Sequence, residues 1–212
     1  MKNNKILKFV LSIALVGIIG VGATLAYFTD TDNAINTITM GHVDIDLYEP
    51  EWSKNNPNSK IEDVKPGQVI VKDPTVKVVE GSADAYVRMK ITVTGNLNEE
   101  KAAELFAKNE NGTYKYLDID NSLWTGVETK EDDVTVYYFY YKDALSAGNV
   151  VTLFDNVTIP ATWGNDVVDK SFNINVTAEA IQADNFTPST VDGVYGWYSN
   201  GKTITPETYE NN

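Results

Sequence analysis

Apolar and polar residues alternate with a period of two in many short stretches of this sequence. The alternation is clearest at 42–47, 86–93 and 172–179, where every second residue is apolar. Successive side chains of a strand point to opposite faces, so each stretch predicts a half-buried β-strand. Turn signals such as Lys65-Pro66-Gly67 and Ala147-Gly148-Asn149 separate the stretches. Roughly eight strands of this kind predict an all-β fold, a jelly-roll-like antiparallel β-sandwich.

One stretch departs from this alternation and predicts a short helical insertion. Asn98 is a suitable N-cap, and the acidic residues Glu99 and Glu100 suit the positive end of a helix. Helix-compatible apolar residues continue the pattern to Phe106. We expect this to be the one helix of the fold, and we expect the polar stretch 52–60 to be a loop.

The first 26 residues have the layout of a secretory signal peptide. Three lysines lie within the first eight residues, and the uncharged stretch 9–26 follows them. Thr24 and Ala26 would occupy positions −3 and −1 of a cleavage site before Tyr27, where small residues are typical. The alternative is an uncleaved membrane anchor, because the stretch approaches the ~20 residues that span a bilayer.

The composition excludes several classes of function. The 212 residues include 17 Lys and Arg, 30 Asp and Glu, one His and no Cys, with a net charge of −13. Removing 1–26 takes away three lysines and no acid, which gives a net charge of −16. Nucleic acid is excluded as a partner, because phosphate binding needs clustered Lys and Arg. Disulfides, thiolate nucleophiles and Cys zinc sites are excluded too.

Four stretches together resemble one known family: 24–30 (TLAYFTD), 36–45 (NTITMGHVDI), 64–68 (VKPGQ) and 178–183 (AEAIQA). The sequence is similar to the TasA/camelysin (CalY) family of Gram-positive bacteria. The resemblance implies a secreted jelly-roll protein that assembles with itself into extracellular fibres of the biofilm matrix. It also implies processing by a dedicated signal peptidase, with the membrane involved only at the precursor stage, and a related accessory matrix protein as a further partner. Camelysins have also been classed as metallopeptidases.

In that family the freed N-terminal segment is thought to add as a strand to the next subunit. Residues 27–40 suit such a donor strand, because they contain no Pro or Gly and carry several β-branched residues. The apolar candidates for burial in a neighbour are Phe28, Ile35, Ile38 and Met40. The alternative is that 35–40 pairs within its own subunit. A head-to-tail contact of the first kind generates a filament.

The residues give little support to a metal or catalytic site. A zincin needs the pattern His-Glu-x-x-His, and this sequence has one histidine, His42. His42, Asp44 and Asp46 share one face of a predicted strand and are weak candidates for a cation site. They are equally the polar face of a half-exposed strand. We therefore expect no catalytic residues, no cofactor and no enzymatic activity.

Aromatic residues at 137–141 (YYFYY) occupy both faces of one predicted strand. One face belongs to the core, and the other is expected to expose two or three rings, unless cross-strand packing covers them. We divide the sequence into a signal peptide (1–26), a donor segment (27–40), a sandwich (41–186) and a tail (187–212) whose last residues are expected to be loose.

The sequence leaves three hypotheses of function: a matrix fibre subunit, a cell-surface camelysin-like metallopeptidase, or a carbohydrate- or host-binding module.

Overall fold

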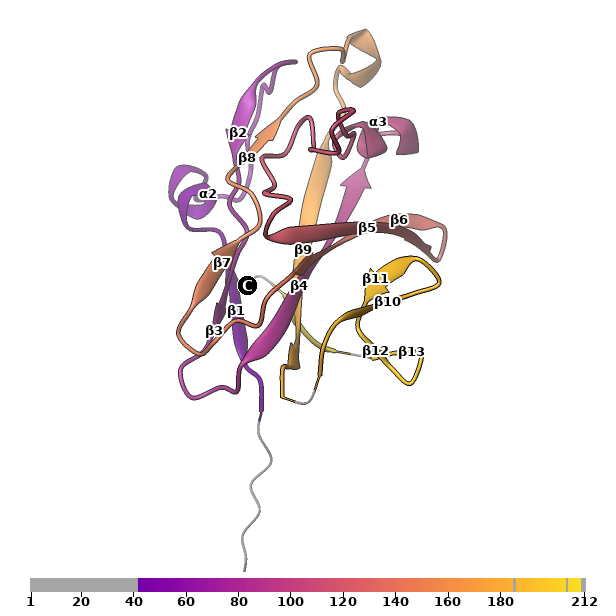
Figure 1. The fold of residues 1–212 in the computed structure, drawn as a ribbon. Helices are drawn as coiled ribbons and strands as arrows, with labels where there is room; N and C mark the ends of the chain where they lie inside the picture. Colours follow the sequence, from indigo (N-terminus) through magenta and orange to yellow (C-terminus); the bar gives the residue numbers. More distant parts are fainter. Residues whose placement is uncertain (1–41, 185, 205, 211–212) are drawn as a thin grey trace, which may run out of the picture. The chain divides into compact units, whose positions relative to one another are not determined.

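The longest strands form one five-stranded antiparallel sheet in the computed structural model, which describes residues 42–184, 186–204 and 206–210, the last four by their backbone alone (Figure 1). The strand order is β14-β9-β4-β6-β5. The bounds are β4 Ala85–Gly95, β5 Trp124–Glu131, β6 Val134–Tyr141, β9 Phe172–Gln182 and β14 Glu207–Glu210. β4 and β9 pair along their whole length. The predicted signal peptide and the predicted donor segment 27–40 lie outside the described residues.

A smaller antiparallel sheet has three strands in the order β1-β3-β7. Their bounds are β1 Ile45–Tyr48, β3 Thr75–Val78 and β7 Val150–Thr152. A separate two-stranded ribbon consists of β2 Val69–Val71 and β8 Asn156–Thr158. The short strands of this part of the molecule follow from the turn signals, because Pro66, Gly67 and Pro74 interrupt the chain between them.

The main core contains side chains from both sheets. Ile45 and Val76 of the small sheet and Met89 and Phe139 of the large sheet belong to one buried cluster and are at most 2% exposed. Most apolar positions that the alternation places inward are buried as predicted, namely Val43, Ile45, Leu47, Val87, Met89, Ile91 and Ala178. Val93, Phe172, Ile174 and Val176 are half-buried. Burying each such side chain contributes about 1.5–3 kcal/mol before the entropy cost. The prediction of an all-β sandwich is confirmed.

The predicted helix is present as α3, Glu99–Glu104. The Asn98 side chain caps it by accepting a hydrogen bond from the backbone N–H of Lys101 at 2.9 Å. α3 is not the only helical segment, because a short 3₁₀ helix, η1, spans Asn165–Val167 and a further helix precedes β2. No helix among the described residues is long and apolar enough to span a membrane.

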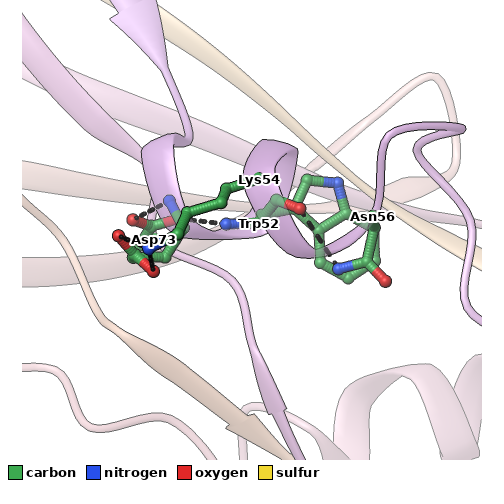
Figure 2. Close-up of polar contacts among 5 residues, drawn as sticks. Trp52, Lys54, Asn56 and Asp73 are labelled. Carbon is green, nitrogen blue, oxygen red and sulfur yellow. Dashed lines mark hydrogen bonds and ion pairs between the residues drawn. The ribbon is translucent and has the colours of Figure 1, made fainter.

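That further helix, α2 at Pro50–Asn55, lies partly where we expected a loop. Its cap comes from a residue distant in sequence. The buried Asp73 carboxylate accepts hydrogen bonds from the backbone N–H groups of Glu51 at 2.9 Å and Trp52 at 3.0 Å (Figure 2). Since a free helix of this length is unstable, the fixed acceptor explains why so polar a stretch is helical.

The C-terminal tail is a layer of short strands, and our expectation of a loose end is wrong at its last described residues. It forms two hairpins, with bounds β10 Ser189–Val191, β11 Val194–Gly196, β12 Tyr198–Ser199 and β13 Lys202–Thr203. Trp197, between the hairpins, is 0% exposed and packs in a second buried cluster with Tyr138 and Tyr140 of β6. The backbone at Glu207–Glu210 then pairs with β9 as the edge strand β14.

Candidate functional site

The outer edge of β1 is the first candidate site, because no described strand pairs with it there. The backbone N–H of Val79 donates to the carbonyl of Asp44 at 2.9 Å, which fixes the hydrogen-bonding register between β1 and β3. Hydrogen-bonded and non-hydrogen-bonded pairs alternate along an antiparallel ladder. Ile45 and Leu47, opposite Val78 and Val76, therefore direct their backbone polar groups away from β3.

The outward backbone groups of Ile45 and Leu47 are largely covered, because each of these residues is buried with its backbone included. Ile45 is 2% exposed and Leu47 is 8% exposed. An unpaired edge of this kind accepts an extended segment through backbone hydrogen bonds. The opposite edge of the small sheet is partly closed, because the indole N–H of Trp124 donates to the carbonyl of Thr152 on β7 at 3.3 Å.

The three weak metal candidates lie along the same strand region but do not form a centre. His42 and Asp46 are exposed, whereas Asp44 is half-buried. The backbone N–H of Asp44 donates to the Ser82 hydroxyl at 2.7 Å. Among residues 42–184, 186–204 and 206, no group of three or more His, Cys, Asp or Glu side chains is arranged to hold a metal ion. The structure therefore places these residues on the polar face of an ordinary half-exposed strand.

A second polar constellation is buried beneath the tail, and no local sequence pattern indicates it. Arg88 of β4 forms an ion pair with Glu179 of β9 and donates from Nη1 to the Tyr140 hydroxyl at 2.7 Å. Its guanidinium carbon lies 4.2 Å from the ring centre of Tyr138 and 4.8 Å from that of Trp197. Arg88 therefore combines an ion pair, a hydrogen bond to a hydroxyl and contacts with aromatic rings, all of which a guanidinium can make.

The expectation that rings of 137–141 are exposed on the outer face is wrong. Tyr138 is 9% exposed and Tyr140 is 5% exposed, because the tail covers them. Burial raises the pKa of Tyr140 above its usual range, while the Arg88 guanidinium acts in the opposite direction. The Tyr138 hydroxyl donates to Glu131 at 2.6 Å, and Lys90 donates to the same carboxylate at 2.7 Å. These two hydrogen bonds lower the pKa of Glu131. This constellation holds the sheet and tail together and is closed to a ligand.

A comparison with known families identifies the family to which the chain belongs. Residues 3–117 match the family model described as camelysin metallo-endopeptidase, which covers more than half of the sequence. The chain belongs to the camelysin family. The resemblance seen in the sequence is thereby confirmed. No curated protein and no solved structure is significantly similar to the chain.

The camelysin name implies a catalytic metal, and the residues present do not fit one. The sequence contains a single histidine and no cysteine. A catalytic zinc site takes three protein ligands, usually including two or more histidines or thiolates. His42 is exposed, and the carboxylates nearest to it in sequence do not converge with it in the described structure. No catalytic step can be derived through a metal from these side chains.

The predicted processing and donor residues cannot be placed. Thr24, Ala26 and Tyr27 of the predicted cleavage site lie outside the described residues, as do Phe28 and Ile38 of the predicted donor strand. The matched camelysin stretch includes both of these segments together with β1 and α3. It ends before Tyr140 and Glu179, so the partners of Arg88 belong to the part of the chain beyond the match.

Proposed function

We propose that this camelysin-family chain is a secreted structural subunit that assembles with itself into extracellular fibres of a Gram-positive biofilm matrix. The observation that carries the proposal is the β1 edge, where Ile45 and Leu47 direct backbone polar groups away from the sheet. The segment 27–40 supplies the chemistry that such an edge accepts, since its sequence is rich in β-branched residues and contains no Pro or Gly. Signal peptidase is the partner during export, and the membrane is involved only before cleavage.

Cleavage before Tyr27 acts in this proposal as the trigger for assembly. A segment that is still joined to a membrane-bound signal peptide has no free end and cannot reach a neighbouring subunit. Each added hydrogen bond contributes about 1 kcal/mol net, and each buried Ile or Met adds about 1.5–3 kcal/mol. Several of each are sufficient for a stable fibre. N-terminal sequencing of the secreted protein is expected to begin at Tyr27.

The test compares four purified chains by light scattering and negative-stain electron microscopy. The chain beginning at Tyr27 and its Ile38→Val variant are expected to form filaments, because valine keeps the strand propensity and most of the apolar surface. The chain beginning at Gly41 and the Ile38→Pro variant are expected to remain monomeric, since proline removes a ladder donor. Identical filaments from the Gly41 chain would reject the donor-strand mechanism and move the interface elsewhere.

A second candidate function is a metallo-endopeptidase, which is favoured by the description of the matched family. The single histidine and the absence of a converging ligand set among the described residues argue against it. A casein assay on highly purified protein, with and without chelator, separates the two functions. Chelator-sensitive cleavage that disappears in His42→Ala would establish the peptidase.

A further inference from the structure

The ribbon of β2 and β8 leaves one edge of β2 unpaired among the described strands (Figure 1). Two hydrogen bonds fix which residues of β2 face that edge. The carbonyl of Gln68 accepts from the backbone N–H of Ile159 at 2.8 Å. The backbone N–H of Lys72 donates to the carbonyl of Asp155 at 3.0 Å. Even-numbered residues of β2 therefore bond to β8, and odd-numbered residues direct their N–H and C=O groups away from it.

The two odd-numbered residues of β2 are valines that meet solvent. Val69 is 58% exposed and Val71 is 38% exposed, whereas Ile70 between them packs against the core. No described residue forms a hydrogen bond with the backbone groups of either valine. Edge strands are commonly protected from pairing by a charge or a proline, and residues 68–71 contain neither. This edge is therefore able to accept a further strand.

The charges around β2 favour a second copy of the chain as that strand. No carboxylate lies between Val64 and Lys72 in the sequence. Lys72 donates to the buried Glu49 carboxylate at 2.6 Å, so its charge is compensated within the same copy. Two chains with a net charge of −16 repel each other, but an approach along β2 brings no carboxylate of this stretch against another.

We propose that β2 pairs antiparallel with β2 of a second copy, across a two-fold axis at Ile70, to form a weak dimer. In this register Val69 of each copy lies opposite Val71 of the other. Every outward N–H group of these valines then meets an outward C=O group, because such opposite residues exchange both hydrogen bonds. The exposed valine side chains of the two copies come together on one face of the joined ribbon.

The same register limits the pairing to a short, closed contact. Pro66 of each copy lies opposite Pro74 of the other, and proline cannot donate to a ladder. Because the contact is the same on both copies, it closes at a dimer and does not propagate. The proposal involves β2 and not β1, so it does not depend on fibre assembly.

A contact of three residues on each copy is small, so the dimer is expected to be weak. Stable protein interfaces bury about 1,200 Å² or more in total, which is more than one short strand provides. We expect a dissociation constant of about 0.1–1 mM. At the micromolar concentrations suited to filament assays, this contact leaves the chain monomeric.

Sedimentation equilibrium between about 10 µM and 1 mM tests the dimer. The protein is the chain beginning at Tyr27 with Ile38→Pro, which keeps the mature length and is expected to form no filaments. Val69→Lys with Val71→Lys is expected to weaken the dimer about tenfold or more, because like charges then lie directly opposite each other. Val134→Lys with Val194→Lys makes the same charge change at two valines that are each 46% exposed, and is expected to dimerise as the parent does.

Cysteine cross-linking tests the register, because the chain has no cysteine of its own. With oxidised glutathione, Ile70→Cys is expected to form disulfide-linked dimers faster than Val69→Cys, although Val69 is the more exposed residue. Two residues at position 70 lie directly opposite each other, whereas two at position 69 are diagonal neighbours roughly 7–8 Å apart, too far for an unstrained disulfide. Circular dichroism verifies the fold of every variant.

Three results would overturn the proposal. The first is a parent that remains monomeric at about 1 mM. The second is a dimer that the β2 lysines weaken no more than the control lysines do. The third is faster cross-linking of Val69→Cys than of Ile70→Cys. If the parent forms no dimer and the β2 lysines instead abolish filaments of the chain beginning at Tyr27, the β2 edge belongs to the donor segment.

Discussion

Arg88 is the only arginine of the chain, and it is 7% exposed between two strands and the C-terminal tail. Arg88 stabilises the fold by compensating the charge of Glu179, which is equally buried. A buried pair adds little over well-packed apolar residues, but loss of one partner leaves an uncompensated charge. The same site gives Tyr140 a hydrogen bond and Trp197 a cation to stack on.

Arg88→Ala is therefore expected to lower the free energy of unfolding by about 3–5 kcal/mol. Urea denaturation of the chain beginning at Gly41, followed by tryptophan fluorescence, measures the loss. Lys130→Ala provides the control, since its ion pair with Glu99 joins side chains that are 62% and 64% exposed, and solvent screening leaves such a pair with little effect on stability. Equal losses in the two variants would contradict the assigned role of Arg88.

The buried residue Tyr137 is expected to make the folded protein less stable at alkaline pH. Burial raises the pKa of Tyr137 from 10.0 to about 12, with the Glu128 and Glu99 carboxylates acting in the same direction. The folded state therefore retains this proton when the unfolded state has lost it. The resulting stabilisation is fully present below pH 10 and is lost as the pH rises from there toward 12.

Absorbance at the tyrosinate band and urea denaturation across this pH range test the prediction together. Tyr137→Phe is expected to lose stability less steeply with rising pH, because the variant has one fewer tyrosine to ionise on unfolding. An unchanged slope in the variant would show that Tyr137 ionises normally in the folded protein.

At the scale of elements, α2 depends on an acceptor supplied from the loop between β2 and β3. Asp73→Ala is expected to cost about 1–2 kcal/mol of stability, because two backbone N–H groups of α2 lose their acceptor (Figure 2). Glu51→Ala removes only an exposed pair with Lys54 and is expected to cost less than about 0.5 kcal/mol. Thermal unfolding of both variants measures the difference, and a Glu51 effect as large as that of Asp73 would contradict it.

Elements defined by local pattern were predictable from the sequence, and elements defined by distant contacts were not. β1, β4 and β9 follow from strict alternation, and α3 follows from its Asn98 cap. α2 was missed because its cap lies 21 and 22 residues from the amides that it accepts.

The two hairpins of the tail were not predicted, although their turns carry a local signal. Asp192-Gly193 and Asn200-Gly201 have positive φ angles of 51° and 82°, and of 51° and 74°, as expected for two-residue hairpin turns. The partners of Arg88 were not predictable, because Tyr140 and Glu179 lie 52 and 91 residues away in sequence.

At the scale of the whole molecule, charge opposes association of identical subunits. The chain without residues 1–26 would carry a net charge of −16. Raising the ionic strength from about 0.01 M to about 0.1 M shortens the screening length from roughly 30 to 10 Å. We expect the chain beginning at Tyr27 to assemble faster at the higher ionic strength. We also expect faster assembly at a pH low enough to protonate carboxylates. Light scattering measures the rates, and slower assembly with added salt would indicate attractive ion pairs between subunits instead.

The central hypothesis is that a neighbour's residues 27–40 pair with an open edge of the sandwich. The most direct measurement is the binding of a synthetic peptide of this segment to the chain beginning at Gly41, which retains the β1 edge and lacks the donor. We expect saturable binding, an increase in β-structure, and inhibition of fibre growth by the mature chain. The Ile38→Pro peptide is expected to do none of these, because it lacks one ladder donor. Absence of binding, or equal binding of the two peptides, would contradict donor-strand assembly.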